Sequence, residues 1–340
     1  MRAHSSTIWP NELGVWNGWA SRGTVTPEYR AGMDTLHKSK ALIIRPSALG
    51  DTLLLAPALS QIADRVEITL VGRGPGVDFL RPLLHGCLEY ERGGWHKLFS
   101  EWPDCRDFSF PQADRVVSFL SDRTGEVKES FRRCLKGIPL FSFSPFPAED
   151  RRMHVALYLA SCLKESGLPV HPEQAVANAR KRGVLGKGRP SGPGRRVVVH
   201  PGSGGREKNY PPEFWVDLVG GEYLEVCEER ILLLGPAEEE RCQYFSARVS
   251  GAGVEVVISP HKEGLVSLLK GAWLYIGHDS GVTHLAAMLG APTIALFRNS
   301  HPFKWAPLGP DVTVIADAKD SNGIFRRIEE RLHRLQELLP

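Results

Sequence analysis

Four segments of the sequence carry residue types that could bind an anion or move a proton. They are residues 45–51, 200–211, 234–241 and 276–287. Each follows a short apolar run of the kind that is buried in a parallel sheet. Because ligands of open parallel sheets collect at the carboxyl ends of the strands, we expect the four segments to surround one site.

The first segment, Arg-Pro-Ser-Ala-Leu-Gly-Asp, joins the opening strand to its helix. Ser47 and Gly50 of this turn are candidates for a loop that contacts phosphate or acceptor, since glycine permits close backbone approach. Asp51 falls in the first helical turn, where a carboxylate favours the positive end of the helix. The same carboxylate could instead accept a proton from an incoming hydroxyl. Spacing alone leaves both interpretations of Asp51 open.

The second segment holds three glycines and Ser203 beside Arg206 and Lys208. Backbone amides together with a cation can share the charge of a diphosphate, so this loop is a candidate anion cradle. It does not match the GxxxxGK[ST] pattern, which argues against an ATPase. A plain mobile loop is the alternative interpretation.

The third segment is a strand-to-helix turn with Glu238 and Glu239 in the first helical turn. Acids at that position complement the helix dipole, and this is a sufficient explanation for them. Either acid could also accept hydrogen bonds from ribose hydroxyls, as acids do in nucleotide-binding folds.

In the fourth segment, Asp279 or Ser280 can cap a helix whose free amides suit phosphate oxygens. Gly281 opens this helix, and His284, one turn on, could reach the same anion or could be a core histidine. A nucleophilic Ser280 is disfavoured because Gly-x-Ser-x-Gly spacing is absent. Asp279 with two histidines lacks the further acid or histidine that a metal site needs, so we expect no metal.

Bulk composition limits the classes of function. The chain has 340 residues, and 42 Lys and Arg against 39 Asp and Glu give a formal charge of +3. This balance does not support nucleic-acid binding, although it leaves open a peripheral contact with the inner membrane. No apolar run could span a membrane, and the N-terminal residues lack a basic segment followed by an apolar core, so we expect no signal peptide and a cytoplasmic protein. Six scattered cysteines predict reduced thiols rather than disulfides.

Strands and helices alternate in both halves of the chain, which predicts two doubly wound, Rossmann-like α/β domains facing each other across a cleft. The expected strands are residues 41–45, 66–71, 88–91, 114–120, 196–200, 231–234, 254–258, 274–276, 293–297 and 312–315. The expected division is an N-terminal extension at 1–40, loosely ordered; a first domain at 41–180; a basic linker at 181–196; a second domain at 197–322; and a final amphipathic helix within 323–340. The glycines, prolines and basic residues of the linker cannot bury a core.

Together the four segments resemble glycosyltransferase family 9, the lipopolysaccharide heptosyltransferases. The turn at 47–51 is similar to the S-x-LGD motif of the family, and residues 277–287 are similar to its D-[TS]-G-x-x-H-x-A-A signature. The loop at 201–211 is similar to its PG…K-x-[WY]-P segment. The resemblance covers residues 41–315, and Arg298 departs from it because members commonly have glycine there.

This resemblance implies a GT-B fold and an inverting transfer of a heptose-like sugar without metal or cofactor. The implied donor is a nucleotide-diphosphate sugar, ADP-heptose in the best-known members, and the implied acceptor is a glycolipid or the lipopolysaccharide core. Asp51 would be the general base. The implied donor-binding residues are Ser203, Lys208, Glu238, Glu239, Asp279, Ser280, Gly281 and His284. The final helix would cross back to the first domain.

Two other functions fit the same architecture. One is a sugar-nucleotide epimerase or hydrolase of GT-B-like fold, which would convert the donor without an acceptor. The other is a non-catalytic protein that binds a nucleotide sugar. The presence of Asp51, Lys208 and His284 argues against the second, because binding alone does not require a base.

Overall fold

The structure is a computed structural model that describes residues 38–99, 105, 110–135, 137–186, 194–316 and 320–337, apart from the side chains of His96 and Arg206. The extension expected at residues 1–40 lies outside this part of the chain except for its last three residues, of which Ser39 begins the first strand. No helix within the described residues is long and apolar enough to cross a membrane.

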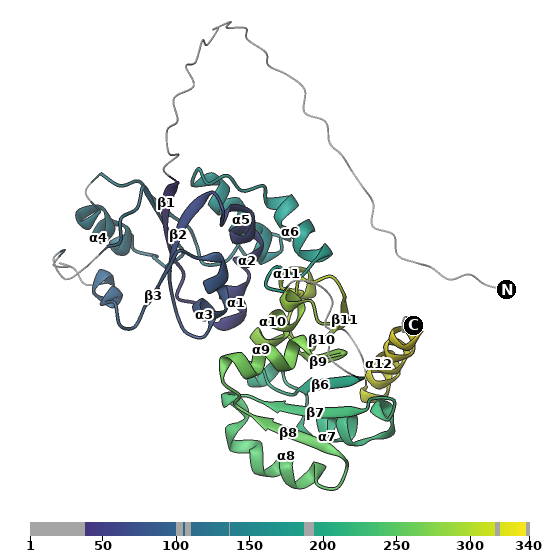
Figure 1. Ribbon diagram of the computed structural model, residues 1–340. Coiled ribbons are helices and arrows are strands. Elements are labelled where there is room, and N and C mark those ends of the chain that lie inside the picture. Colours follow the sequence, from purple (N-terminus) through teal and green to yellow (C-terminus); the bar gives the residue numbers. More distant parts are fainter. Residues whose placement is uncertain are drawn as a thin grey trace, which may run out of the picture. The chain divides into compact units, whose positions relative to one another are not determined.

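The first domain is built on a five-stranded sheet in which every pairing is parallel, as expected. Its strands are β1 (Ser39–Ile44), β2 (Val66–Gly72), β3 (Gly86–Glu89), β4 (Arg115–Ser118) and β5 (Leu140–Ser142), in the order β3-β2-β1-β4-β5. Figure 1 labels the first three of these strands. The chain order reverses beside β1, so β1 is the point at which the strand order switches direction. Crevices form at such points because the following loops diverge.

Helices connect these strands. They are α1 (Leu49–Leu53), α2 (Ala56–Ile62), α3 (Gly76–Leu80), α4 (Glu126–Cys134), α5 (Val155–Glu165) and α6 (Pro172–Lys181), with short 3₁₀ turns η1 (Arg81–Leu83) and η2 (Trp95–Phe99). The central β1 is buried from Ala41 to Ile44. A continuous apolar run is what a parallel strand covered on both faces requires.

The second domain repeats this plan with six parallel strands. They are β6 (Arg196–His200), β7 (Glu229–Leu234), β8 (Val254–Ile258), β9 (Leu274–His278), β10 (Thr293–Phe297) and β11 (Val312–Ala316), in the order β11-β10-β9-β6-β7-β8 (Figure 1). Its helices are α7 (Pro212–Gly220), α8 (Cys242–Val249), α9 (Lys262–Lys270), α10 (Gly281–Leu289), α11 (Pro302–Trp305) and α12 (Ser321–Gln336), with 3₁₀ turns η4 (Arg206–Lys208), η5 (Glu222–Leu224) and η6 (Pro236–Arg241).

The start of α10 packs closely on the start of α1. A Cβ atom added at Gly281 would lie 2.6 Å from Leu49 Cγ, and one added at Gly50 would lie 3.2 Å from His284 Cδ2. At Gly281 any other side chain would push the two turns apart, and at Gly50 it would press on the His284 ring. This packing brings the first and fourth candidate segments together.

The expectation that the final helix returns to the first domain is wrong. The buried side chains of α12 belong to the apolar cluster of the second sheet, and Phe325 packs on Phe214 and Tyr223 with ring centroids 4.9 Å apart in both pairs. Its apolar stripe, Ile324, Phe325, Ile328, Leu332 and Leu335, is buried there. An amphipathic helix buries its stripe against the nearest uncovered apolar surface, and that surface belongs to the second domain.

The chain returns to the first domain earlier, around α11. Lys304 Nζ donates to the Glu149 carbonyl at 2.9 Å, and His154 Nε2 lies 2.9 Å from the Ala306 carbonyl. The rings of Phe146 and Trp305 meet edge to face at 5.5 Å. Residues 302–306 therefore connect the second domain to the loop that follows β5.

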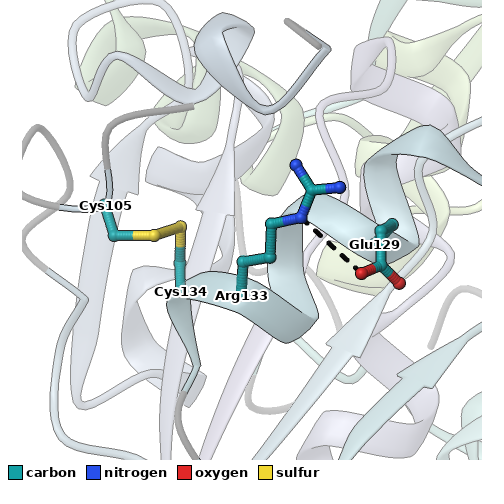
Figure 2. The surroundings of a disulfide bond; sticks show 4 residues. All are labelled: Cys105, Glu129, Arg133 and Cys134. Atoms are coloured by element: carbon teal, nitrogen blue, oxygen red, sulfur yellow. Dashed lines mark ion pairs between the residues drawn. A yellow bond between two sulfur atoms is a disulfide. The ribbon is translucent and has the colours of Figure 1, made fainter. Parts of the chain in front are cut away.

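The expectation that all six cysteines are reduced is also wrong for one pair. Cys105 and Cys134 form a disulfide across a sequence separation of 29 residues, with Cα atoms 5.0 Å apart. Figure 2 shows the bond at the end of α4, beside the ion pair of Arg133 and Glu129. Such a separation carries no spacing signal, so only the fold could bring the two sulfurs together. The other cysteines are free: Cys87, Cys162, Cys227 and Cys242.

Candidate active site

A cavity of about 600 Å³ is lined by residues of all four candidate segments. Its walls include Gly50 and Asp51 from the first domain and, from the second, Ser203, Lys208, Glu238, Asp279, Ser280, Gly281 and His284. The expected convergence at the carboxyl ends of the strands is therefore present in the structure. The walls also include His200, Phe146 and Trp305, which were not among the candidate site residues.

Two candidate residues, Ser47 and Glu239, do not line this cavity. Ser47 does not line it, and its backbone instead braces the turn by accepting a hydrogen bond from Thr52 Oγ1 at 3.1 Å. Glu239 does not line it either and is exposed. The backbone of Arg206 belongs to η4, and its side chain lies outside the described part of the structure.

Asp51 lies in the first turn of α1 and also faces the cavity, so its two interpretations are compatible. Burial raises the pKa of its carboxyl group above the usual value, and the negative charge of Asp279 adds to this effect. The positive charges of Arg45 and Lys208 oppose it. A carboxylate with a raised pKa is a stronger base than an exposed aspartate, which suits proton abstraction near neutral pH.

Lys208 and Asp279, on the part of the wall that the second domain supplies, form an ion pair with Nζ and Oδ2 3.3 Å apart. His284 Nε2 lies 3.8 Å from the other oxygen of Asp279. Burial lowers the pKa of His284 to about 4, so this imidazole is neutral at pH 7. Among the side chains that the structure describes, Lys208 is therefore the cation that this wall presents to a ligand.

Ser280 caps α10, and its Oγ accepts a hydrogen bond from the Thr283 N–H at 3.3 Å. The first N–H groups of a helix have no partner within it, and Ser280, Gly281 and Val282 all line the cavity. The positive end of α10 thus faces the same space as the Lys208 ammonium. An anion bound there would meet both.

The glycine-rich loop before α7 is held in place by hydrogen bonds, which argues against the mobile-loop interpretation. Ser203 Oγ lies 2.6 Å from Asn209 Oδ1 and 2.9 Å from the Gly205 carbonyl. Arg298, the departure from the family pattern, donates to the Asn209 carbonyl at 2.6 Å and lies over the Tyr210 ring. Arg298 therefore supports the loop that carries Lys208.

Glu238 is buried beneath this loop and lines the cavity. Its Oε2 accepts a hydrogen bond from the Gly235 N–H at 2.9 Å, and its carboxylate packs directly on Gly202. A side chain at position 202 would collide with that carboxylate, which would then have to move. The third segment therefore contributes one acid to the cavity, Glu238, rather than two.

His200 was missed as a site residue. Its Nδ1 lies 2.9 Å from the Leu233 carbonyl, and because a carbonyl only accepts, Nδ1 carries the proton. Burial lowers the pKa of His200, so the ring is neutral. Its position at the end of β6 was the available signal, since strand ends were already expected to border the site. Among the described residues, no group of three or more His, Cys, Asp or Glu side chains could hold a metal ion.

Similar proteins of known sequence match segments of this chain. A putative glycosyltransferase of Haemophilus influenzae is 31% identical over 118 residues, which are 33% of this chain and 34% of that protein. Lipopolysaccharide heptosyltransferase 1 of Escherichia coli is 34% identical over 98 residues, 28% of this chain and 30% of that protein. The matched segments thus span about a third of these relatives' length.

Solved structures match nearly the whole fold. The E. coli heptosyltransferase WaaC with ADP superposes with a TM-score of 0.62 at 19% identity, covering 86% of this chain and 99% of that one. The glycosyl transferase family 9 protein of Veillonella parvula gives 0.61 at 16% identity, covering 90% and 98%. At these identities the likeness shows the fold alone, and that fold is GT-B: two Rossmann-like domains with a cavity at their strand ends.

The sequence narrows this class further. The model of glycosyltransferase family 9 (heptosyltransferase) matches residues 124–334, which are more than half of the chain. The protein therefore belongs to glycosyltransferase family 9 and is a glycosyltransferase.

Proposed function

We propose that this enzyme transfers a heptose-like sugar with inversion and without a metal ion. The proposed donor is a nucleotide-diphosphate sugar, with ADP-heptose favoured, and the proposed acceptor is the lipopolysaccharide core or a related glycolipid. The observation that carries this proposal is that Asp51 of the first domain and Lys208 with the α10 N-terminus of the second line one cavity. The heptosyltransferase WaaC has been solved with ADP and with ADP-2-deoxy-2-fluoro heptose, which supports the choice of donor.

In the proposed reaction, the donor diphosphate lies against Lys208 and the amides at the start of α10. Asp51 accepts the proton of the acceptor hydroxyl, and that oxygen forms a bond to the anomeric carbon from the face opposite the leaving group. The bond from the anomeric carbon to the diphosphate oxygen breaks in the same step. The diphosphate leaves with the electron pair, and the cation and amides stabilise its charge.

Several residues have supporting roles in this proposal. Glu238 faces the ribose of the donor, since its carboxylate lies beneath the glycine-rich loop. Asp279 orients Lys208 through their ion pair. Ser203 acts through the shape of the loop, because its hydroxyl already bonds within it. A cytoplasmic location at the inner face of the membrane is part of the same proposal, because the acceptor is a glycolipid.

The test is transfer and binding by the Asp51→Asn variant. It is expected to bind the donor nucleotide within about twofold of the wild type but to lose at least about a hundredfold in transfer rate, the usual contribution of a general base. Asp64→Asn, an exposed carboxylate at the end of α2, is the matched control. Undiminished transfer by Asp51→Asn would reject Asp51 as the base. Conversion of the donor without any acceptor would instead favour an epimerase or hydrolase, and binding without turnover would favour a non-catalytic protein.

A further inference from the structure

Arg45 is a fully buried cation behind the cavity wall. It directly follows β1 and has no exposed surface. Its guanidinium carbon lies 5.4 Å from the centroid of the Phe119 ring and 5.4 Å from that of Phe146. Burying a charge between two rings costs free energy, even with a favourable cation–π contact. An apolar side chain would fill the same space at lower cost, so the charge at this position calls for an explanation.

The guanidinium links two loops that border the cavity. Its Nε donates to the Asp51 carbonyl at 3.1 Å, and its Nη1 donates to the Pro145 carbonyl at 2.8 Å. The first bond holds the α1 turn that carries Asp51. The second bond holds Pro145, the residue before Phe146. Phe146 lines the cavity, and its ring packs on Trp305 of the second domain. One planar group thus sets the distance between the carboxylate and the aromatic wall.

The charge of Arg45 also acts on Asp51. Burial raises the pKa of the Asp51 carboxyl group, and Arg45 is the largest influence in the opposite direction, ahead of Lys208. Arg45 itself stays protonated at neutral pH, because burial lowers its pKa only to about 10. The other titratable side chains that line the cavity are His200, Glu207, Lys208, Glu238, Asp279 and His284.

We propose that Arg45 is a positioning residue for the reaction: it holds the Asp51 turn against the Phe146 loop and supplies the buried counter-charge of the Asp51 carboxylate. This inference rests on the function proposed above. Arg45 does not line the cavity and therefore acts on the substrates only through Asp51 and Phe146. Its removal should impair transfer more than donor binding, because the donor lies mainly on the second domain.

The test compares Arg45→Met and Arg45→Lys with the wild type in kcat, donor KM and the pH profile of kcat/KM. In Arg45→Met, kcat should fall at least about tenfold with donor KM within about twofold, a loss confined to the transition state. The acid limb of the profile should move up by about one pH unit, since an opposite charge near Asp51 is lost. Arg45→Lys keeps the charge but cannot make both hydrogen bonds, to the Asp51 and Pro145 carbonyls. Its acid limb should therefore stay at the wild-type pH, while its kcat should be lower.

Arg65→Met is the matched control, because Arg65 also donates to two backbone carbonyls, but these belong to Gln61 and Pro169, which do not line the cavity. Melting temperature and donor binding report whether each variant folds. If Arg45→Met does not fold, the kcat of Arg45→Lys tests the inference. A wild-type kcat in Arg45→Lys, or a limb that does not move in a folded Arg45→Met, would overturn the inference. These results would leave the proposed function intact as long as the wild type transfers sugar and Asp51→Asn does not.

Discussion

Lys208 Nζ lies 3.3 Å from Asp279 Oδ2, and this ion pair joins the η4 turn to the residue that precedes the α10 cap. The Asp279 side chain is 7% exposed, whereas that of Lys208 is 36% exposed. The Asp279 carboxylate is therefore fixed in the wall, and the Lys208 ammonium can turn towards a ligand while it stays paired with that carboxylate.

Replacing Lys208 should weaken donor binding. Lys208→Met removes a charge-assisted hydrogen bond to phosphate, and such a bond contributes about 1.5–3 kcal/mol, which corresponds to roughly a 10- to 100-fold rise in donor Kd. Titration calorimetry with the nucleotide diphosphate measures the change. Lys270→Met, an exposed lysine at the end of α9, serves as the control. An unchanged Kd in Lys208→Met would show that the diphosphate binds elsewhere.

Gly202→Ala should displace Glu238. The added methyl group would collide with the buried Glu238 carboxylate, which must then leave its hydrogen bond to the Gly235 N–H. We expect a donor Kd at least about tenfold higher, in line with the loss of one or two hydrogen bonds to a charged group. Gly220→Ala is the control, because its nearest neighbour, Ala252 Cβ, would be 3.8 Å away. Equal donor affinity in the two variants would contradict a role for Glu238 in binding.

Gly281→Ala tests the close packing of α10 on α1. A Cβ at position 281 would lie 2.6–2.8 Å from three atoms of Leu49, so one of the two turns must move. Overpacking of this kind costs about 1–3 kcal/mol, so the melting temperature should fall by several degrees. Transfer should fall more than donor binding, because Asp51 lies two residues beyond Leu49. A variant with wild-type melting temperature and kcat would mean that the two turns do not need this contact.

His154 should make the fold sensitive to acid. Burial lowers its pKa from 6.5 to about 4 in the folded chain, so the neutral ring stabilises the fold above pH 6.5 and this contribution is lost as the pH falls towards 4. A shift of this size corresponds to roughly 3 kcal/mol. The difference in unfolding free energy between the wild type and His154→Gln, measured in urea at several pH values, should shrink across that interval.

His171→Gln, which replaces an exposed histidine, controls for the general effect of removing an imidazole. Its difference from the wild type should vary less with pH than that of His154→Gln. A constant difference for His154→Gln between pH 7 and pH 4 would contradict the assignment of a neutral, buried ring. Burial also lowers the pKa values of His278 and His284, so the unfolding free energy of the wild type should itself fall over the same interval.

Local patterns predicted the strands and helices that have a long apolar run or a clear cap. The buried run at 41–45 predicted β1, and Ser280 with the apolar residues after it predicted α10. The patterns missed α4 and α6. The helix α4 keeps only Val127, Ser130 and Phe131 buried, so its apolar signal is short. The helix α6 buries mainly small residues, Pro172, Ala175, Val176 and Ala179.

Within the site, the sequence could not tell which candidate residues line the cavity, whereas the fold does. Glu238 and Glu239 are equivalent in a helical first turn, but the η6 turn brings only Glu238 back to the Gly235 N–H. Arg45 carried no motif signal, because its partners Asp51, Phe119 and Phe146 come from three separate parts of the chain. The disulfide of Cys105 and Cys134 and the packing of α12 depend in the same way on distant segments.

The sequence by itself therefore determined the two parallel α/β domains and the four segments at their strand ends, because hydrophobic periodicity and glycine-rich turns act over a few neighbouring residues. Only the tertiary structure decided which side chains of those segments share a cavity. Packing of α1 against α10 brings Asp51 into the cavity that Lys208 also lines, and burial there raises the pKa of Asp51. Desolvation and charge pairing depend on distances between residues far apart in the chain, and no local pattern encodes them.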